Sequence, residues 1–147
     1  PDPFYLSRPL ISDEKAQSLI QDQIVTSAPD EDRLNLYFYS RQKGTWPQLV
    51  SDHNPKIEGE WFKNYCPIEN IDSSFPPVLL IHGDKDTDVP FTESVHMNDK
   101  LKSKGVKSKL LLLKNYDHVF DLFAGGLSNP DIAKVFEEVR MFLDQSK

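Results

Sequence analysis

Cysteine is almost absent from this sequence, since Cys66 is the only one among 147 residues. A single cysteine cannot close an internal disulfide, so the fold does not depend on oxidation. The neighbours Tyr65 and Pro67 bring no cation that would activate the thiol. We therefore interpret Cys66 as a packed thiol rather than a nucleophile.

Long apolar runs and an excess of positive charge are also missing. The apolar runs, such as Leu110 to Leu113, are far too short to span a bilayer. The 17 basic and 23 acidic residues give a formal net charge of −6, so neither nucleic acid nor an anionic membrane is expected as a partner. The first residues, Pro1 to Phe4, lack the basic start and apolar stretch of a signal peptide. Because the chain does not begin with Met, a cytoplasmic and an exported protein both stay open.

Residues 1–75 form an irregular first part, which we expect to be a partly helical, cap-like segment. Apolar residues at helical spacing predict a helix over 13–24, with Ser12 or Asp13 as its cap. A second helix is predicted over 33–41, ended by the Gly44 and Pro47 region. Residues 45–75 are typical of loops and short turns.

Residues 76–147 follow a regular pattern. Short apolar runs predict strands over 78–81 and 109–113, and the first reads as a strand buried on both faces. A helix is expected from Thr92 or Ser94 to Lys104, a loop over 115–128, and an amphipathic helix over 131–145. This β-α-β-loop-α order predicts an α/β fold with a parallel sheet flanked by helices.

The loops that follow the two strands carry the candidate chemistry. The first strand runs into the sequence HGDKDTDVP, and the second into KNYDHVF. Sites in open parallel sheets form beyond the carboxyl ends of the strands, so these loops should meet. A carboxylate that orients an imidazole is the core of a Ser-His-Asp triad. We expect Asp86 to orient the ring of His118, and His118 to act as general base and then general acid.

The segment from Pro76 to Pro90 resembles the acid loop of α/β-hydrolases of the prolyl-oligopeptidase and dienelactone-hydrolase groups. Their pattern is a hydrophobic strand, His-Gly, two variable residues, the catalytic Asp, two more residues, then Val and often Pro. This resemblance places the catalytic acid at Asp86 and the catalytic histidine at His118. The histidine loop of the family commonly reads Asp-His-Gly-Phe, whereas Val119 stands here in place of the glycine.

Glycine is scarce as well, and the arrangement of the six glycines bears on the missing nucleophile. α/β-Hydrolases present their serine in a Gly-x-Ser-x-Gly turn that precedes the acid in the chain. No serine lies between two glycines at that spacing. The resemblance therefore implies that this chain is the C-terminal portion of a serine esterase, with its nucleophile upstream. The chain alone should be inactive, and its expected partner is the missing N-terminal half or a second subunit.

Two alternatives to an esterase function stay open. The parent could hydrolyse a peptide bond, as prolyl oligopeptidases do, instead of a carboxylic ester. The chain could also be a non-catalytic interaction module derived from the fold, because a fold does not fix a function. Neither a metal nor an organic cofactor is expected. A calcium loop built on Asp84, Asp86 and Asp88 is disfavoured, because Val89 stands where an EF-hand requires glycine.

Several other polar and aromatic residues are also functional candidates. Asp84 and Asp88 are rivals of Asp86 that we expect to be solvated or to make local turn contacts. His82 is expected to be structural, while His53 and His96 should be surface residues. The aromatic side chains between residues 37 and 65 suit either a lid over an acyl pocket or ordinary packing, and we favour packing. Arg41 is expected to form an ordinary ion pair rather than bind a substrate carboxylate.

Overall fold

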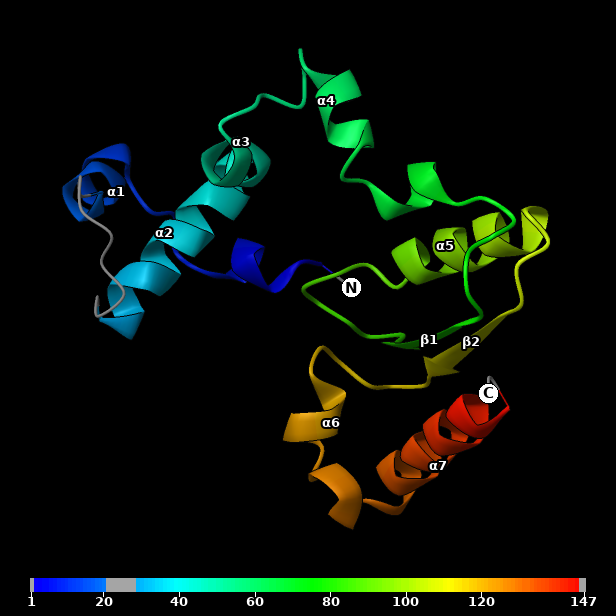
Figure 1. Ribbon diagram of the computed structural model, residues 1–147. Coiled ribbons are helices and arrows are strands. Elements are labelled where there is room, and N and C mark those ends of the chain that lie inside the picture. The colour runs from blue at the N-terminus through cyan, green and yellow to red at the C-terminus, as the bar shows by residue number, and fades with distance from the viewer. Residues whose placement is uncertain (1, 21–28, 146–147) are drawn as a thin grey trace. The chain divides into compact units, whose positions relative to one another are not determined.

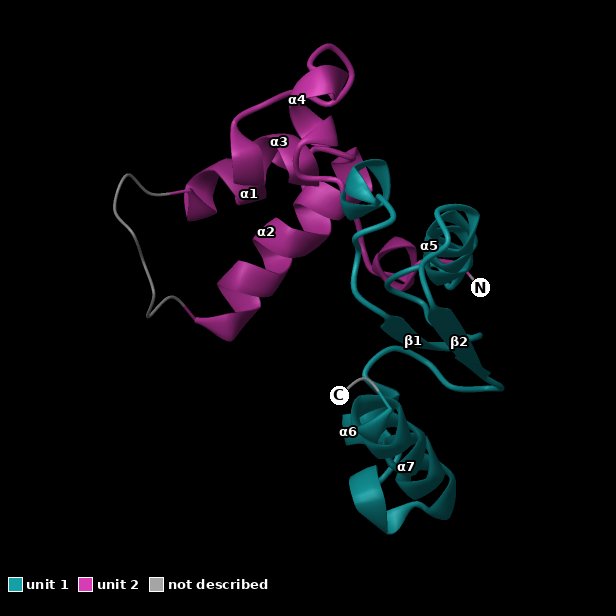
Figure 2. Ribbon diagram, turned by 45° about the vertical axis from the view of Figure 1, so that its right-hand side comes forward, with its two compact units in different colours: residues 1, 67–147 teal, residues 2–66 magenta. Residues whose placement is uncertain are grey.

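The computed structural model describes residues 2–20 and 29–145 (Figure 1). The chain divides into two compact units (Figure 2): a helical unit of residues 2–66 and a sheet unit that begins at residue 67. We expected the boundary after residue 75, and that boundary between domains stays a prediction. In the structure, residues 67–75 pack with the sheet unit, where Ile71 belongs to the apolar core.

The sheet unit is built on two parallel strands, β1 (Val78–Gly83) and β2 (Ser108–Leu113). Their register pairs Val78 with Ser108 and Gly83 with Leu113, so both strands end at the same edge. The expected α/β architecture with a parallel sheet is therefore confirmed. Between the strands runs α5 (Thr92–Ser103), which ends before Gly105, a residue with a φ of 75°. A left-handed conformation of this kind favours glycine.

Helices cover both faces of this small sheet. In Figures 1 and 2, α5 and α7 (Pro130–Asp144) lie on opposite sides of the strands. The core on the α5 side joins Leu101 and Val106 with Ile71, and further apolar side chains pack against them: Ile68, Phe75, Val78, Leu80 and Met97. Asn129 caps α7 by accepting a hydrogen bond from the backbone N–H of Asp131 at 2.9 Å. The cap and Pro130 at the first turn explain why α7 begins where it does.

The first strand was expected to be buried on both faces, and the structure shows a weaker burial. Only Gly83 of β1 is buried, while the other strand residues are half-buried. Large apolar side chains also remain exposed near the sheet: Leu112, Phe136 and Leu143. The physical reason is the size of the sheet, because only two strands are present in the part of the chain that the structure describes.

The helical unit holds short helices joined by tight turns. It contains the 3-10 helix η1 (Phe4–Ser7), then α1 (Asp13–Leu19) and α2 (Asp30–Lys43). The predicted cap of the first helix is confirmed, because the Ser12 hydroxyl accepts from the backbone N–H of Lys15 at 3.2 Å. Residues 21–24 of that predicted helix lie outside the described residues. Helix α2 ends at Gly44, whose φ is 69°.

The expectation of loops and turns over residues 45–75 was wrong in part. Two short helices occupy this stretch, α3 (Trp46–Ser51) and α4 (Gly59–Lys63), followed by the 3-10 helix η2 (Pro67–Asn70). Pro47 lies in the first turn of α3, where proline is well tolerated. The expected loop over 115–128 likewise contains α6 (Phe120–Phe123) and η3 (Gly126–Ser128). Helices of one turn are too short to leave a periodic pattern. Within the described ranges, no helix combines the length and apolar character that crossing a bilayer requires.

Candidate active site

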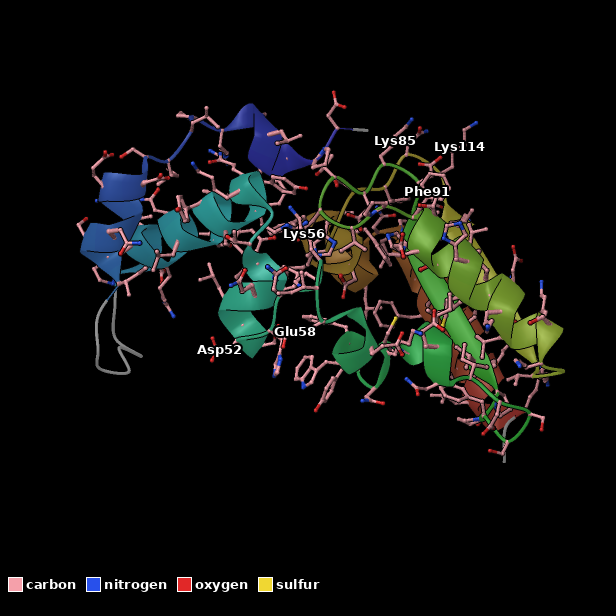
Figure 3. All side chains as sticks on the ribbon, turned by 90° about the horizontal axis from the view of Figure 1, so that it is seen from above. Asp52, Lys56, Glu58, Lys85, Phe91 and Lys114 are labelled. Atoms are coloured by element: carbon pink, nitrogen blue, oxygen red, sulfur yellow. The ribbon has the colours of Figure 1, made fainter. Side chains whose placement is uncertain are left out.

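Two loops meet at the carboxyl ends of the strands: the acid loop, residues 84–90, and the histidine loop, residues 114–118. The backbone N–H of Asp84 donates to the carbonyl of Leu113 at 3.0 Å, and that of Lys85 donates to the carbonyl of Tyr116 at 3.0 Å. In Figure 3 the side chains of Lys85 and Lys114, one from each loop, lie at the same end of the sheet unit. Backbone hydrogen bonds alone therefore already join the two loops.

Gly83 permits this close approach. A Cβ atom at this position would lie 2.2 Å from the carbonyl oxygen of Tyr116 and 2.7 Å from its carbonyl carbon. No real side chain tolerates such a contact with backbone, so the two loops could not pack in this way with any other residue at position 83. The glycine of the His-Gly pair is thus required by the geometry of the loop pair.

Asp86 is the buried carboxylate of the site. Its Oδ1 accepts hydrogen bonds from the backbone N–H groups of Asp88 at 2.9 Å and Val89 at 2.8 Å. Its Oδ2 lies 2.9 Å from Nδ1 of His118, and the side chain is only 6% exposed. Burial acts to raise the pKa of Asp86, but the hydrogen bonds from His118, Val89 and Asp88 outweigh it, so the pKa lies below its ordinary value. Asp86 is thus held as an anion.

His118 presents its ring between this anion and solvent. Because the Asp86 carboxylate can only accept, Nδ1 of His118 carries the hydrogen and Nε2 keeps its lone pair in the neutral ring. The ring is 43% exposed, and Nε2 lies 3.7 Å from Oδ2 of Asp88. The hydrogen bond to Asp86 raises the pKa of His118, and the negative charges of Asp86, Asp88 and Asp117 add to this effect against partial desolvation. The geometry is that of a base oriented by an acid.

Asp117 was not recognised from the sequence as more than the neighbour of the histidine. Its Oδ1 accepts from the backbone N–H of Thr87 at 2.8 Å and from that of His118 at 2.7 Å. The Thr87 hydroxyl donates to the same oxygen at 3.0 Å. Burial acts to raise the pKa of Asp117, but these backbone hydrogen bonds prevail and lower it. Asp117 therefore ties the acid loop to the backbone of His118.

Val119 adopts a conformation that its side chain disfavours. Its φ is 53° and its ψ 37°, the left-handed region in which β-branched residues are rare. This is the position at which the resembling family commonly has glycine. The backbone here adopts a conformation that suits glycine, and the chain accepts a strained valine at the start of α6.

A shallow cavity of about 310 Å³ lies beside the acid and the imidazole. Its lining combines the polar groups with apolar side chains, namely Ile81, His82, Asp86, Val89, His118, Val119, Phe120 and Asp121. A mostly apolar hollow with a few convergent polar groups is the usual form of a small-molecule site. Larger cavities exist elsewhere, for example one of about 540 Å³ around Gln42 in the helical unit, but that one has no histidine in its lining.

The rival carboxylates of the acid loop have different partners. Asp84, which we expected to be solvated or to make local turn contacts, bonds across the loop pair: its Oδ1 accepts from the backbone N–H of Asn115 at 2.6 Å. Asp88 faces the outer edge of the His118 ring. The three aspartates therefore diverge, and among the residues described here no cluster of three His, Cys, Asp or Glu side chains is arranged to hold a metal ion.

The remaining candidates of the helical unit find partners within that unit. The guanidinium of Arg41 lies over the rings of Tyr5 at 4.6 Å and Tyr37 at 5.4 Å and donates a hydrogen bond to the Tyr37 hydroxyl at 2.9 Å. Its expected ion pair stays a prediction. His53 stacks on Trp61 with ring centroids 3.9 Å apart and contacts Glu58 at 2.8 Å. The aromatic side chains form edge and tilted contacts with one another, which is the packing arrangement.

Comparison with known proteins identifies the family. The model of the prolyl oligopeptidase family, Peptidase_S9, matches residues 24–146. A truncated form of a carbohydrate esterase from gut microbiota is 27% identical with a TM-score of 0.52, over 65% of this chain and 31% of that one. A thermophilic esterase from the Planctomycetes species Thermogutta terrifontis, in a butyrate-bound structure, is 23% identical with a TM-score of 0.52, over 86% of this chain and 39% of that one.

A short stretch also resembles a much larger enzyme, a non-reducing polyketide synthase of Acremonium egyptiacum. The two are 46% identical over 46 residues, which is 31% of this chain and 2% of the synthase. The chain thus spans well under half of each of these proteins. Its parallel strands and flanking helices are a partial α/β-hydrolase fold. The match of the family model over most of its length shows that the chain belongs to the prolyl oligopeptidase family.

Proposed function

We propose that this chain is the C-terminal part of a serine hydrolase that cleaves carboxylic esters, with Asp86 as the acid and His118 as the base of its triad. The observation that carries the proposal is the 2.9 Å contact between Oδ2 of Asp86 and Nδ1 of His118. The nucleophilic serine belongs to a part of the hydrolase outside these 147 residues. The exposed apolar side chains beside the two strands suit a surface that further strands of a larger sheet would cover.

The proposed mechanism follows from the protonation states of the pair. Nε2 of His118 takes the hydroxyl proton of the serine as its oxygen attacks the ester carbonyl, and the Asp86 anion stabilises the imidazolium that forms. His118 then returns the proton to the alcohol that leaves, which gives an acyl-serine. Water, deprotonated by His118, attacks that ester, and His118 then returns this proton to the serine oxygen as the carboxylic acid leaves. The backbone donors for the oxyanion lie outside this chain.

The test uses this chain joined to the part of the hydrolase that carries the serine, with p-nitrophenyl butyrate as substrate. His118→Ala should abolish turnover, and Asp86→Asn should lower kcat on the order of 10⁴-fold, because the tautomer of the imidazole is lost. Matched controls are His96→Ala and Asp99→Asn, which change exposed residues on α5 and should leave the rate unchanged. An unchanged rate in either site variant would refute the assignment.

The choice between ester and peptide substrates has its own measurement. The two solved structures named above are described as esterases, and this favours an ester for the parent of this chain. The butyryl p-nitrophenyl ester should be cleaved far faster than the butyryl p-nitroanilide, which has the same acyl group in an amide. A clear preference for the anilide, or for peptides, would indicate a peptidase.

A further inference from the structure

His82 is a largely buried titratable side chain for which the proposed mechanism has no use. It is the penultimate residue of β1, and its side chain is only 12% exposed. Both of its ring nitrogens nevertheless have polar partners: Nδ1 lies 2.7 Å from the hydroxyl of Ser94, and Nε2 lies 3.0 Å from the carbonyl oxygen of Val89. Through these two contacts the ring connects α5 with the acid loop.

The surroundings of His82 determine the tautomer of its neutral ring. Nε2 faces the carbonyl of Val89 at 3.0 Å and Oδ2 of Asp86 at 3.1 Å, and neither oxygen carries a hydrogen. Nε2 must therefore hold the ring hydrogen and donate it to Val89. Nδ1 then keeps a lone pair, which accepts the hydroxyl hydrogen of Ser94 from the first turn of α5.

Val89 links this ring to the acid. Its backbone N–H donates to Oδ1 of Asp86 at 2.8 Å, while its carbonyl accepts from His82. His82 therefore holds the carbonyl group of Val89, and the N–H group of the same residue holds the Asp86 carboxylate. The same ring edge lies against Oδ2, the carboxylate oxygen that His118 contacts.

We propose that His82 is a positioning residue, which holds the Asp86 carboxylate in the orientation that His118 requires and is itself anchored by Ser94. The inference rests on the proposed function, because the pair that it positions is the proposed acid and base. Loss of the Nε2 donor should let residues 86–89 relax and weaken the Asp86–His118 contact. The pKa of His118 should then fall toward its ordinary value, because that contact is the main reason it is raised.

Two substitutions separate positioning from packing. The side-chain amide of Gln places its nitrogen near the position of Nε2, whereas the shorter amide of Asn reaches only the position of Nδ1. In this chain, NMR titration of the His118 ring should show that its pKa stays raised in His82→Gln. In His82→Asn the pKa of His118 should fall toward its ordinary value. In the chain joined to its serine-bearing part, His82→Asn should reduce kcat by up to about 10²-fold with little change in KM. Equal behaviour of the two variants, whether both keep or both lose the raised pKa, would overturn the proposal.

A second test uses the unmodified chain, so a folding defect in a variant cannot affect its result. The ¹⁵N chemical shifts of the His82 ring should be those of the Nε2–H tautomer, and the opposite tautomer would overturn the proposal. Asp86→Asn separates this inference from the proposed function. If the pKa of His118 does not respond to Asp86→Asn, the acid–base assignment itself fails. If it responds to Asp86→Asn but not to His82→Asn, only the positioning role of His82 fails.

Discussion

In the sheet unit, several different side chains form hydrogen bonds to residues about thirty positions away, while in the helical unit Gln42 forms several such bonds. The loops of the sheet unit are joined by Asn115 to Asp84, Thr87 to Asp117 and His118 to Asp86. In the helical unit, His53 pairs with Glu58 only five residues away, whereas Gln42 bonds to distant backbone at Tyr5, Pro9 and Ile11. Several independent bonds can fix a geometry that one side chain cannot.

The two units also differ in what they bury. The buried apolar residues of the sheet unit are Ile71, Leu101, Val106 and Ile132, whereas Ala16 is the one found among the described residues of the helical unit. The helical unit gains its contacts from partly exposed aromatic rings instead. A catalytic pair needs rigid supports, and the proposed acid and base, Asp86 and His118, lie in the unit with the cross-linked loops.

The largest expected effect that would break this comparison comes from Gly83→Ala. The added Cβ would force Tyr116 away from the acid loop, and we expect a loss of about 1–3 kcal/mol or more in the free energy of unfolding. Amide hydrogen exchange in β1 and β2 would measure it for the sheet unit alone. The control is Gly59→Ala in the helical unit, where a Cβ meets no atom within 4 Å and where stability should not fall. Similar losses in both variants would mean that the loop pair is not uniquely constrained.

A smaller effect of opposite sign is expected from Val119→Gly. Val119 and Asp52 both have positive φ, 53° and 61°, one in each unit. A β-branched residue is strained there, while aspartate is tolerated. Val119→Gly should therefore raise the free energy of unfolding by about 1 kcal/mol, after the greater chain entropy of glycine is counted. Asp52→Gly should change the free energy of unfolding by only about a few tenths of a kcal/mol. Urea denaturation of both variants would decide, and destabilisation by Val119→Gly would show that the valine is not strained.

The sequence predicted those parts of the fold and the site that depend on a sequence motif or on the periodic spacing of apolar residues. The strand beginning at Val78, the stop at Gly105 and the pairing of Asp86 with His118 all follow from local pattern or from family resemblance. The hydrogen bond by which Asp117 joins the two loops could not be predicted, because its contact with Thr87 depends on how the loops align in space. The packing of Ile71 with Leu101 was hidden for the same reason, since nothing near Ile71 signals its distant partner.

The smallest expected effect is on the stability at low pH, and salt should change this effect differently in the two units. Asp86 and Asp13 both have pKa values below their ordinary ones, Asp86 because hydrogen bonds outweigh burial, and Asp13 because of the hydrogen bond and charge of Lys43. A carboxylate with a lowered pKa in the folded state adds stability above its unfolded pKa of about 3.9, and this stability is lost as the pH falls through the folded pKa.

For Asp86→Asn, the difference in unfolding free energy from the unsubstituted chain should therefore narrow as the pH falls below about 4, at low salt and in about 1 M salt alike. Asp86 is buried and its partners are hydrogen bonds, which salt screens poorly. For Asp13→Asn, the narrowing should appear only at low salt, because the Asp13–Lys43 pair is exposed to solvent. Denaturant titrations between about pH 2 and 6 at both salt concentrations would measure the two differences. If salt abolished the effect of Asp86 as readily as that of Asp13, the acid loop would be far more open to water than its hydrogen bonds imply.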